Sequence, residues 1–250
     1  MSRFPADTPV RRVLAFAAHP DDIDFGAAGT LAKWADQGAE VSYCVMTDGD
    51  AGGFEPGDRA GVSTLRSGEQ RAAADIVGAA QVHFLGERDG FLAVNHEVIG
   101  RVVELIRRVR PDVVLSMHPE RNWDRIQASH PDHLACGEIV TRAVYPAAEN
   151  PFAYPELESA GLQAYKVPWL WFYGAPRERE NHAVDITAEL DRKLAAIRVH
   201  ASQHPDIDGM DASVRSFLRE NAQRHGLSAG SSAEVFHVVG VNTPVTIAGF

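Results

Sequence analysis

The sequence predicts an α/β fold with a Rossmann-like, mostly parallel sheet, helices on both faces and an irregular C-terminal portion that completes the site. Short apolar runs alternate with helical patterns through the first half of the chain. The first run, 13–18, leads directly into His19-Pro20-Asp21-Asp22, at a strand end of the kind where open α/β sheets bind ligands. A similar tetrapeptide, His130-Pro131-Asp132-His133, opens a helical pattern about 110 residues later.

The elements of the first half follow from periodicity and from turn residues. Buried strands are expected at 13–18, 40–47, 81–85 and 112–117, because each is a short apolar run between breakers. Helices are expected at 29–37, 65–77, 97–109 and from 131 to about 144. The glycine-rich stretch 48–63 indicates a loop.

The second half is less regular. It predicts an aromatic strand at 166–173, a helix at 190–202 and late strands at 235–239 or 241–247. The aromatic side chains Trp169, Trp171, Phe172 and Tyr173 indicate core packing, with sugar stacking as the alternative. We expect one domain over 1–250, with a Rossmann-like core in 1–150 and an extension of the same domain in 151–250.

Composition excludes several classes of protein. The net charge is −10 and no Lys/Arg cluster stands out, which argues against nucleic acid as a partner. No run approaches the roughly 20 apolar residues of a membrane span, and residues 1–12 lack an apolar signal-peptide core. Cys44 and Cys136 do not form a C-x-x-C motif, so we expect them to be buried in a reducing compartment. A cytoplasmic protein is predicted.

The two tetrapeptides together supply the side chains of a metal site. Catalytic zinc commonly takes three protein ligands and keeps one position open. His19 and Asp22 are three residues apart on a tight turn, and His133 offers a third ligand. His130 lies three residues before His133 and would face the same way on a helix. Each residue alone also has a plain structural interpretation, such as a helix cap, but the set is what metal-assisted hydrolysis requires.

Further motifs surround these tetrapeptides. They are Gly26 and Gly29, Thr47-Asp48-Gly49, Arg66-x-x-Glu69, Pro111–Val114, Asp191–Ile197 with His200, Ser202 and Gln203, and Ala233–Phe236. With these motifs the chain resembles, over nearly its whole length, the LmbE-like or PIG-L family of zinc-dependent N-acetylglucosamine deacetylases. The two tetrapeptides in this order are the specific part of the resemblance.

The resemblance implies a role for each central residue. His19, Asp22 and His133 would bind zinc, although this ligand set also accepts Fe²⁺ or Co²⁺. Asp21 would be the general base that takes a proton from the attacking water. His130 would contact the tetrahedral intermediate and help to protonate the leaving amine.

Three other residues have paired interpretations. Arg66 would lie near the substrate sugar, or would pair with Glu69 across one helical turn. Asp89 would accept a hydrogen bond from a ligand hydroxyl, or would be a turn residue before Gly90. Asp132 would orient a neighbouring histidine of the metal site, or would be a simple helix-start carboxylate.

The chain departs from the family at one position. Some relatives carry a tyrosine two residues before the first histidine of the second tetrapeptide, where this chain has Ala128. The contribution of that phenol is absent or comes from elsewhere, for example from Trp123. For His118, at a strand end, we expect a positioning role.

The predicted function is removal of an N-acetyl or N-acyl group from an amino sugar or sugar conjugate, a small-molecule partner. The alternative keeps the metal site for amidase or hydratase chemistry on a non-sugar substrate. A distant alternative is a D-x-D phosphatase at Asp48-Gly49-Asp50, although Gly52 replaces the usual Thr or Val of that motif. Dinucleotide binding at 26–29 lacks the full glycine pattern. The oligomeric state stays open, a homo-oligomer included.

Overall fold

The computed structural model of the chain describes residues 4–5, 8–52, 59–244 and 246. Within these ranges, seven strands form one sheet in the order β3-β2-β1-β4-β5-β7-β6. The strands are β1 (Arg12–Ala17), β2 (Glu40–Thr47), β3 (Gln81–Glu87), β4 (Val113–Met117), β5 (Trp169–Tyr173), β6 (His182–Asp185) and β7 (Ala233–Gly240). Neighbours from β3 to β5 are parallel, and β7 is antiparallel to both β5 and β6. The predicted mostly parallel sheet is confirmed.

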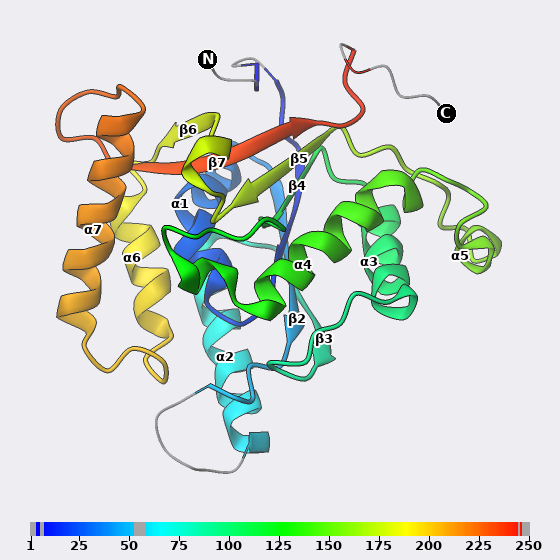
Figure 1. The fold of residues 1–250 in the computed structure, drawn as a ribbon, viewed down its shortest axis with the longest axis horizontal. Coiled ribbons are helices and arrows are strands. Elements are labelled where there is room, and N and C mark those ends of the chain that lie inside the picture. Colours follow the sequence, from blue (N-terminus) through cyan, green and yellow to red (C-terminus); the bar gives the residue numbers. More distant parts are fainter. Residues whose placement is uncertain (1–3, 6–7, 53–58, 245, 247–250) are drawn as a thin grey trace.

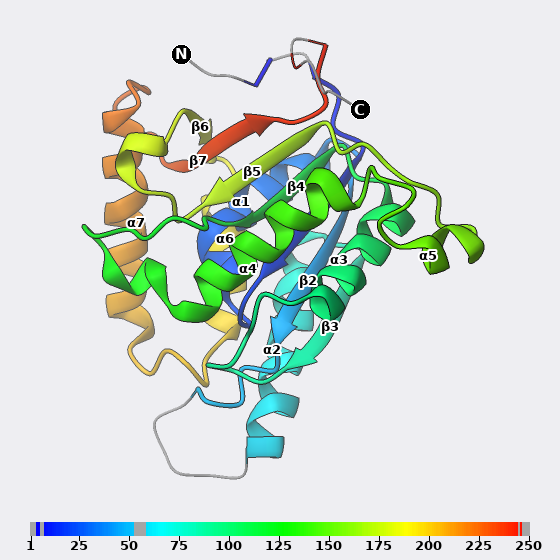
Figure 2. The ribbon, with the colours of Figure 1, turned by 45° about the vertical axis from the view of Figure 1, so that its right-hand side comes forward.

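Helices cover both faces of this sheet. They are α1 (Asp22–Asp36), α2 (Arg59–Val77), α3 (His96–Val109), α4 (Pro131–Arg142), α5 (Pro155–Ser159), α6 (Leu190–Val199) and α7 (Ile207–Arg224). Helices α3 and α4 pack together on one face, and α1, α2 and α6 pack together on the other (Figures 1 and 2). Helix α7 lies against β6 and β7. None of the helices in the described ranges has the length and apolar character needed to cross a bilayer.

The order of the strands places the site. Strand β1 is fully buried from Val13 to Ala17 and lies between β2 and β4. From β1 the chain first builds β2 and β3 on one side, and then crosses to β4 on the other. Such a switch point is where open α/β sheets bind ligands, at the carboxyl ends of the strands. The two histidine tetrapeptides follow β1 and β4 at this place.

The first helix begins earlier than predicted. It starts at Asp22 instead of 29, so Asp22 lies in its first turn. Gly26 and Gly29 lie inside α1 and allow this helix to approach its neighbours closely. A Cβ atom at Gly26 would lie 2.3 Å from Cδ2 of Tyr173 on β5, and one at Gly29 would lie 2.6 Å from Cδ1 of Ile186. Helix α2 also begins earlier, at Arg59, and shortens the predicted loop, of which 53–58 lie outside the described residues.

The second half differs more from the predictions. Strand β6 and helices α5 and α7 were not predicted, and the helix expected at 190–202 ends at Val199. Of the two late strands, 235–239 is correct, because it lies within β7. Residues 241–244 and 246 form no strand, and the remainder of the 241–247 alternative lies outside the described residues. The β5 aromatics are buried in the core, as predicted.

Candidate active site

The first tetrapeptide forms a tight turn between β1 and α1. The backbone N–H of His19 donates to Oδ2 of Asp22 at 2.8 Å, which closes the turn. Asp21 has φ +97° and ψ −31°, a conformation that L side chains rarely adopt. The side chain of Asp22 is therefore directed back toward His19, and that of Asp21 is set apart from it.

The second tetrapeptide begins α4. His130 is the N-cap residue, and its Nδ1 accepts a hydrogen bond from the N–H of Asp132 at 3.3 Å. Pro131 occupies the first turn, where a missing N–H costs nothing. His133 follows within that turn, and its Nδ1 lies 3.4 Å from the carbonyl oxygen of Ala128. The backbone at Ala128, where some relatives carry a tyrosine, thus orients His133.

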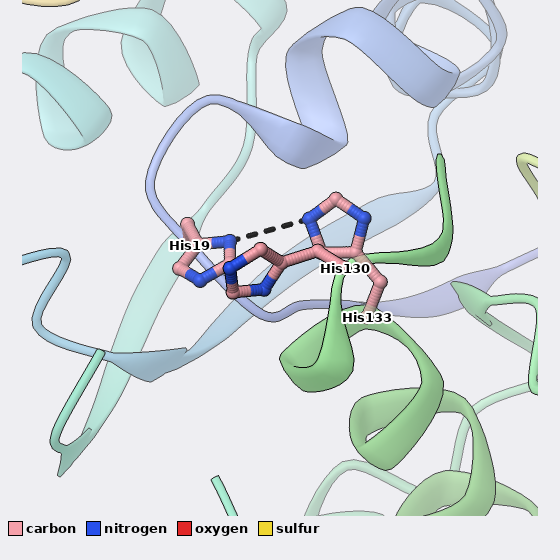
Figure 3. Close-up of side chains that lie close together, drawn as sticks. All are labelled: His19, His130 and His133. Atoms are coloured by element: carbon pink, nitrogen blue, oxygen red, sulfur yellow. Dashed lines mark hydrogen bonds between the residues drawn. The ribbon is translucent and has the colours of Figure 1, made fainter. Parts of the chain in front are cut away.

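The three predicted metal ligands converge. Nδ1 of His19 lies 3.4 Å from Oδ2 of Asp22 and 3.3 Å from Nε2 of His133, and Nε2 of His133 lies 3.2 Å from Oδ1 of Asp22. Metal–ligand bonds of about 2.0–2.1 Å in a tetrahedral site place the ligand atoms about 3.3 Å apart. The separations are of this size, with Oδ2 of Asp22 facing His19 and Oδ1 facing His133. Ring nitrogens of His19, His130 and His133 also lie within 4.8 Å of one another (Figure 3).

The other nitrogen of His19 faces two further carboxylates. Nε2 lies 3.1 Å from Oδ1 of Asp89 and 3.2 Å from Oδ2 of Asp132. Asp132 is fully buried and accepts hydrogen bonds from the N–H groups of Gly90 at 2.6 Å and Leu92 at 3.1 Å. Asp132 therefore contacts a histidine of the site, in agreement with the orienting interpretation, and fixes the β3–α3 loop to α4.

Negative charge dominates around His19. Burial disfavours the charged imidazole, but hydrogen bonds to Asp132, Asp22 and Asp89 outweigh burial and raise the pKa of His19 to about 12. The Asp22 carboxylate keeps a pKa well below its usual range, because His133 and His19 outweigh its burial. Three carboxylates around two imidazoles favour a cation, so the donor set fits a divalent metal.

Arg66 lies on α2 and is directed beneath the first tetrapeptide. Its side chain is buried, and it donates to the carbonyl oxygens of Pro20 at 2.7 Å and Gly49 at 3.0 Å. It also lies 3.4 Å from Oδ2 of Asp21. Glu69 accepts instead from the backbone and hydroxyl of Ser202. Arg66 is thus built into the wall of the site beside Asp21.

Two other residues singled out from the sequence lie away from the convergent ligands. Nε2 of His118 is 2.9 Å from Nδ1 of His237, and Nδ1 of His118 accepts from the N–H of Glu120. Both nitrogens of His118 therefore serve protein groups, as expected for a positioning residue. Trp123 is 80% exposed, with the guanidinium of Arg121 over its ring at 5.5 Å.

A group of buried polar residues behind the first turn of α1 was not predicted from the sequence. Gln70 and His200 both bond to the buried carboxylate of Asp24, and Lys193 pairs with Glu234 at 2.7 Å. The motifs of the family resemblance include His200 and the segments that contain Lys193 and Glu234. They do not include Gln70 or Asp24. One signal was available in the sequence. Asp24 follows a buried strand closely, and a buried carboxylate needs hydrogen-bonding partners.

Comparison with known proteins identifies the family. Residues 14–144 match the family model PIG-L: GlcNAc-PI de-N-acetylase. Diacetylchitobiose deacetylase of Thermococcus kodakarensis is 34% identical over 199 residues, covering 79% of this chain and 72% of that protein. The 1D-myo-inositol 2-acetamido-2-deoxy-alpha-D-glucopyranoside deacetylase of Rhodococcus erythropolis is 28% identical, covering 77% and 81%.

A solved structure agrees with these matches. The structure of N,N'-diacetylchitobiose deacetylase from Pyrococcus horikoshii superposes with a TM-score of 0.84 at 28% identity, and it covers 95% of this chain and 88% of that one. The fold and the sequence matches agree over most of the chain. The chain belongs to the PIG-L family.

Proposed function

We propose that the protein is a metal-dependent N-deacetylase that hydrolyses the acetamide of an amino sugar or sugar conjugate to acetate and a free amine. The observation that supports this best is the convergence of His19, Asp22 and His133 beside Asp21, in a chain whose relatives are deacetylases of such sugars. Water supplies one oxygen of the acetate and the proton that the leaving nitrogen gains when the amide bond breaks.

Three residues would hold the metal: His19 through Nδ1, His133 through Nε2, and Asp22 through its carboxylate. When bound, a divalent ion supplies Lewis-acid polarisation of the acyl carbonyl and lowers the pKa of the attacking water. Zn²⁺ is the ion we propose, and Fe²⁺ and Co²⁺ suit the same donors. Asp132 and Asp89 lie at Nε2 of His19, so Nδ1, which faces Asp22 and His133, would be the nitrogen available to a metal.

Asp21 is the proposed base. It directly precedes Asp22 in the chain, and its Oδ2 lies 3.4 Å from Nη2 of Arg66 and 3.7 Å from Nε2 of His204. Both terminal nitrogens of Arg66 donate to protein oxygens, so we propose that Arg66 orients Asp21 instead of contacting the sugar. A carboxylate fixed in this way can accept a proton from the attacking water and later return it to the leaving amine.

His130 is the proposed stabiliser of the oxyanion. Its Nδ1 accepts from the N–H of Asp132, so in the neutral ring the proton is on Nε2. Burial and the neighbouring His19 and His133 lower the pKa of His130, which favours this neutral form. The Nε2–H group can therefore donate to the acyl oxygen. Asp89, close to His19 and 8% exposed, is the proposed acceptor for a substrate hydroxyl.

Acetate release tests the function directly. The metal-free protein is reconstituted with Zn²⁺, Fe²⁺ or Co²⁺ and incubated with N-acetylglucosamine, N,N'-diacetylchitobiose and N-acetylglucosaminyl inositol. Acetate and primary amine should appear in equal amounts with at least one metal and should cease on chelation. Absence of both products from every substrate with every metal would overturn the proposal.

We also propose that the enzyme is located in the cytoplasm. Cys44 and Cys136 are free and buried, which supports the predicted cytoplasmic location. The proposed partner is a small N-acetylated sugar or glycoconjugate.

A further inference from the structure

A fully buried glutamine connects α2 to the turn that carries Asp21. Oε1 of Gln70 accepts a hydrogen bond from the backbone N–H of Asp21 at 2.8 Å. Nε2 of the same amide donates to Oδ2 of Asp24 at 2.8 Å. Gln70 has 0% exposed surface, so no solvent competes for either bond.

The orientation of the Gln70 amide is fixed by chemistry. The N–H of Asp21 can only donate, and the carboxylate of Asp24 can only accept, so the oxygen of Gln70 must face Asp21 and its nitrogen Asp24. Asp24 is held in turn by Nε2 of His200 at 2.9 Å, and Asp24 and His200 are both fully buried. Helices α1 and α2 and the end of α6 are thereby joined at one point.

The bond lies at the most strained backbone position of the turn. Asp21 has φ +97°, where a residue with a Cβ persists only if the surrounding structure holds it. Glycine would adopt this conformation without strain. The aspartate at position 21 therefore has a conformational cost that glycine would not have. The hydrogen bond that its N–H donates to Gln70 helps to offset this cost.

We propose that Gln70, oriented by Asp24 and His200, is a positioning residue that holds the Asp21 carboxylate beside the metal ligands. The inference rests on the proposed function, in which Asp21 is the base. The hydrogen bonds of Gln70 go to the backbone N–H of Asp21 and to the carboxylate of Asp24, so its effect passes through the backbone of Asp21. It should therefore govern the rate of turnover and leave the binding of metal and substrate largely unchanged.

Charge-matched exchange provides the test. Gln70→Glu places a carboxylate against that of Asp24. Asp24→Asn removes the charge to which Gln70 and His200 donate and adds a buried N–H₂ donor beside them, so the Gln70 amide is held more weakly. In the double variant Gln70→Glu/Asp24→Asn, the side chain at position 24 becomes the donor and that at position 70 the acceptor of the hydrogen bond between them. The total charge equals that of the wild type, and an oxygen of the side chain at position 70 still faces the N–H of Asp21. We expect each single variant to lower kcat about 10–100-fold, as for a misplaced catalytic group, with KM and zinc affinity by calorimetry within about 2-fold.

The double variant should recover kcat to within about 5-fold of the wild type, because misplacement is relieved. Gln223→Leu, an exposed glutamine on α7, is the control and should leave kcat unchanged. A merely structural role would lower kcat, metal affinity and melting temperature together and would show no recovery. Single variants with wild-type kcat would also overturn the inference.

A second measurement does not depend on activity. Hydrogen exchange of the Asp21 amide, followed by NMR, should be slow in the wild type, at least 10-fold faster in Gln70→Leu, and slow again in the double variant. If no substrate is turned over but this pattern holds, the proposed function fails while the hydrogen bond is verified. If exchange is equal in all variants, the positioning inference fails whatever the activity.

Discussion

The imidazole of His19 is held through Nε2 by Oδ2 of Asp132 at 3.2 Å, so the second tetrapeptide orients the first. Asp132 itself cannot turn away, because the N–H groups of Gly90 and Leu92 donate to its two oxygens. This carboxylate, together with that of Asp89, therefore determines which nitrogen of His19 faces His133 and Asp22. Carboxylates in this position fix the ring and raise its basicity as a ligand.

Replacement of Asp132 by alanine should therefore weaken zinc binding by about 10–100-fold, as measured by competition with a chelator. Glu138→Gln removes an exposed carboxylate from the same helix and should leave affinity unchanged. Equal affinities in Asp132→Ala and the wild type would show that Asp132 only caps the helix.

The proposed base gives a second prediction. Asp21→Asn keeps the shape of the side chain but cannot take a proton, so kcat should fall by about 10²–10⁴-fold. Zinc binding should stay near the wild-type value, because Asp21 is not among the convergent ligands. The control is Asp36→Asn, at the exposed end of α1. Acetate release at the wild-type rate in Asp21→Asn would exclude Asp21 as the base.

The close approach of α1 to β5 predicts a stability effect. Gly26→Ala adds a Cβ that would lie 2.3 Å from the ring of Tyr173, and the free energy of unfolding should fall by about 1–3 kcal/mol. Gly68→Ala in α2 meets no atom within 4 Å and should stabilise the protein by about 0.5–1 kcal/mol. Urea denaturation of both variants measures these two changes in the free energy of unfolding. If helix propensity alone determined stability, both variants would be more stable than the wild type.

The Lys193–Glu234 pair gives a fourth prediction. Both side chains are almost fully buried, with N–O separation 2.7 Å, and Lys193 also donates to the carbonyl oxygens of Asp24 and Phe25. Lys193→Met leaves the buried carboxylate of Glu234 without its counter-ion and should cost about 3–5 kcal/mol. Arg142→Gln breaks an exposed pair and should cost less than about 1 kcal/mol. Similar costs for the two variants in urea denaturation would contradict this account.

His118 predicts a dependence of stability on pH. Burial and the nearby His237 lower the pKa of His118 from 6.5 to about 4. The unfolded chain therefore takes up a proton on this residue at a higher pH than the folded one, so the contribution of His118 to stability is complete above pH 6.5 and is lost as the pH falls to 4. Denaturation of metal-free protein should show a loss of up to about 3 kcal/mol from this group. His118→Gln should flatten the curve between pH 6.5 and 4, and an unchanged slope would assign the loss to other groups.

The elements that could be predicted from the sequence are those with a clear apolar pattern or a helix cap within the element itself. Strand β1 is a continuous apolar run, and α3 begins at an asparagine cap and has one apolar face. Helix α1 was placed too late because Gly26 and Gly29 serve packing against other elements, which a local pattern does not show. Helix α7 was missed although Asp206 caps it, because its exposed surface gives a weak apolar stripe.

The same distinction applies to the site. The contacts among His19, Asp22 and His133 could be predicted because these residues lie within two short motifs. The partners of Asp24 and of the Asp21 backbone could not, because Gln70 is 49 residues from Asp21 and His200 is 176 residues from Asp24. Only the folded chain brings together contacts of such long range.

The place of Glu234 on β7 has a consequence for synthesis of the protein. Both oxygens of Glu234 accept from backbone N–H groups of α1, at Gly29 and Thr30, and one also holds Lys193. During translation β7 emerges after the six other described strands, so the ribosome has made every proposed metal ligand well before this clamp on the first helix exists. Helix α1, which begins at the last residue of the first tetrapeptide, is thus secured only after β7 has been made.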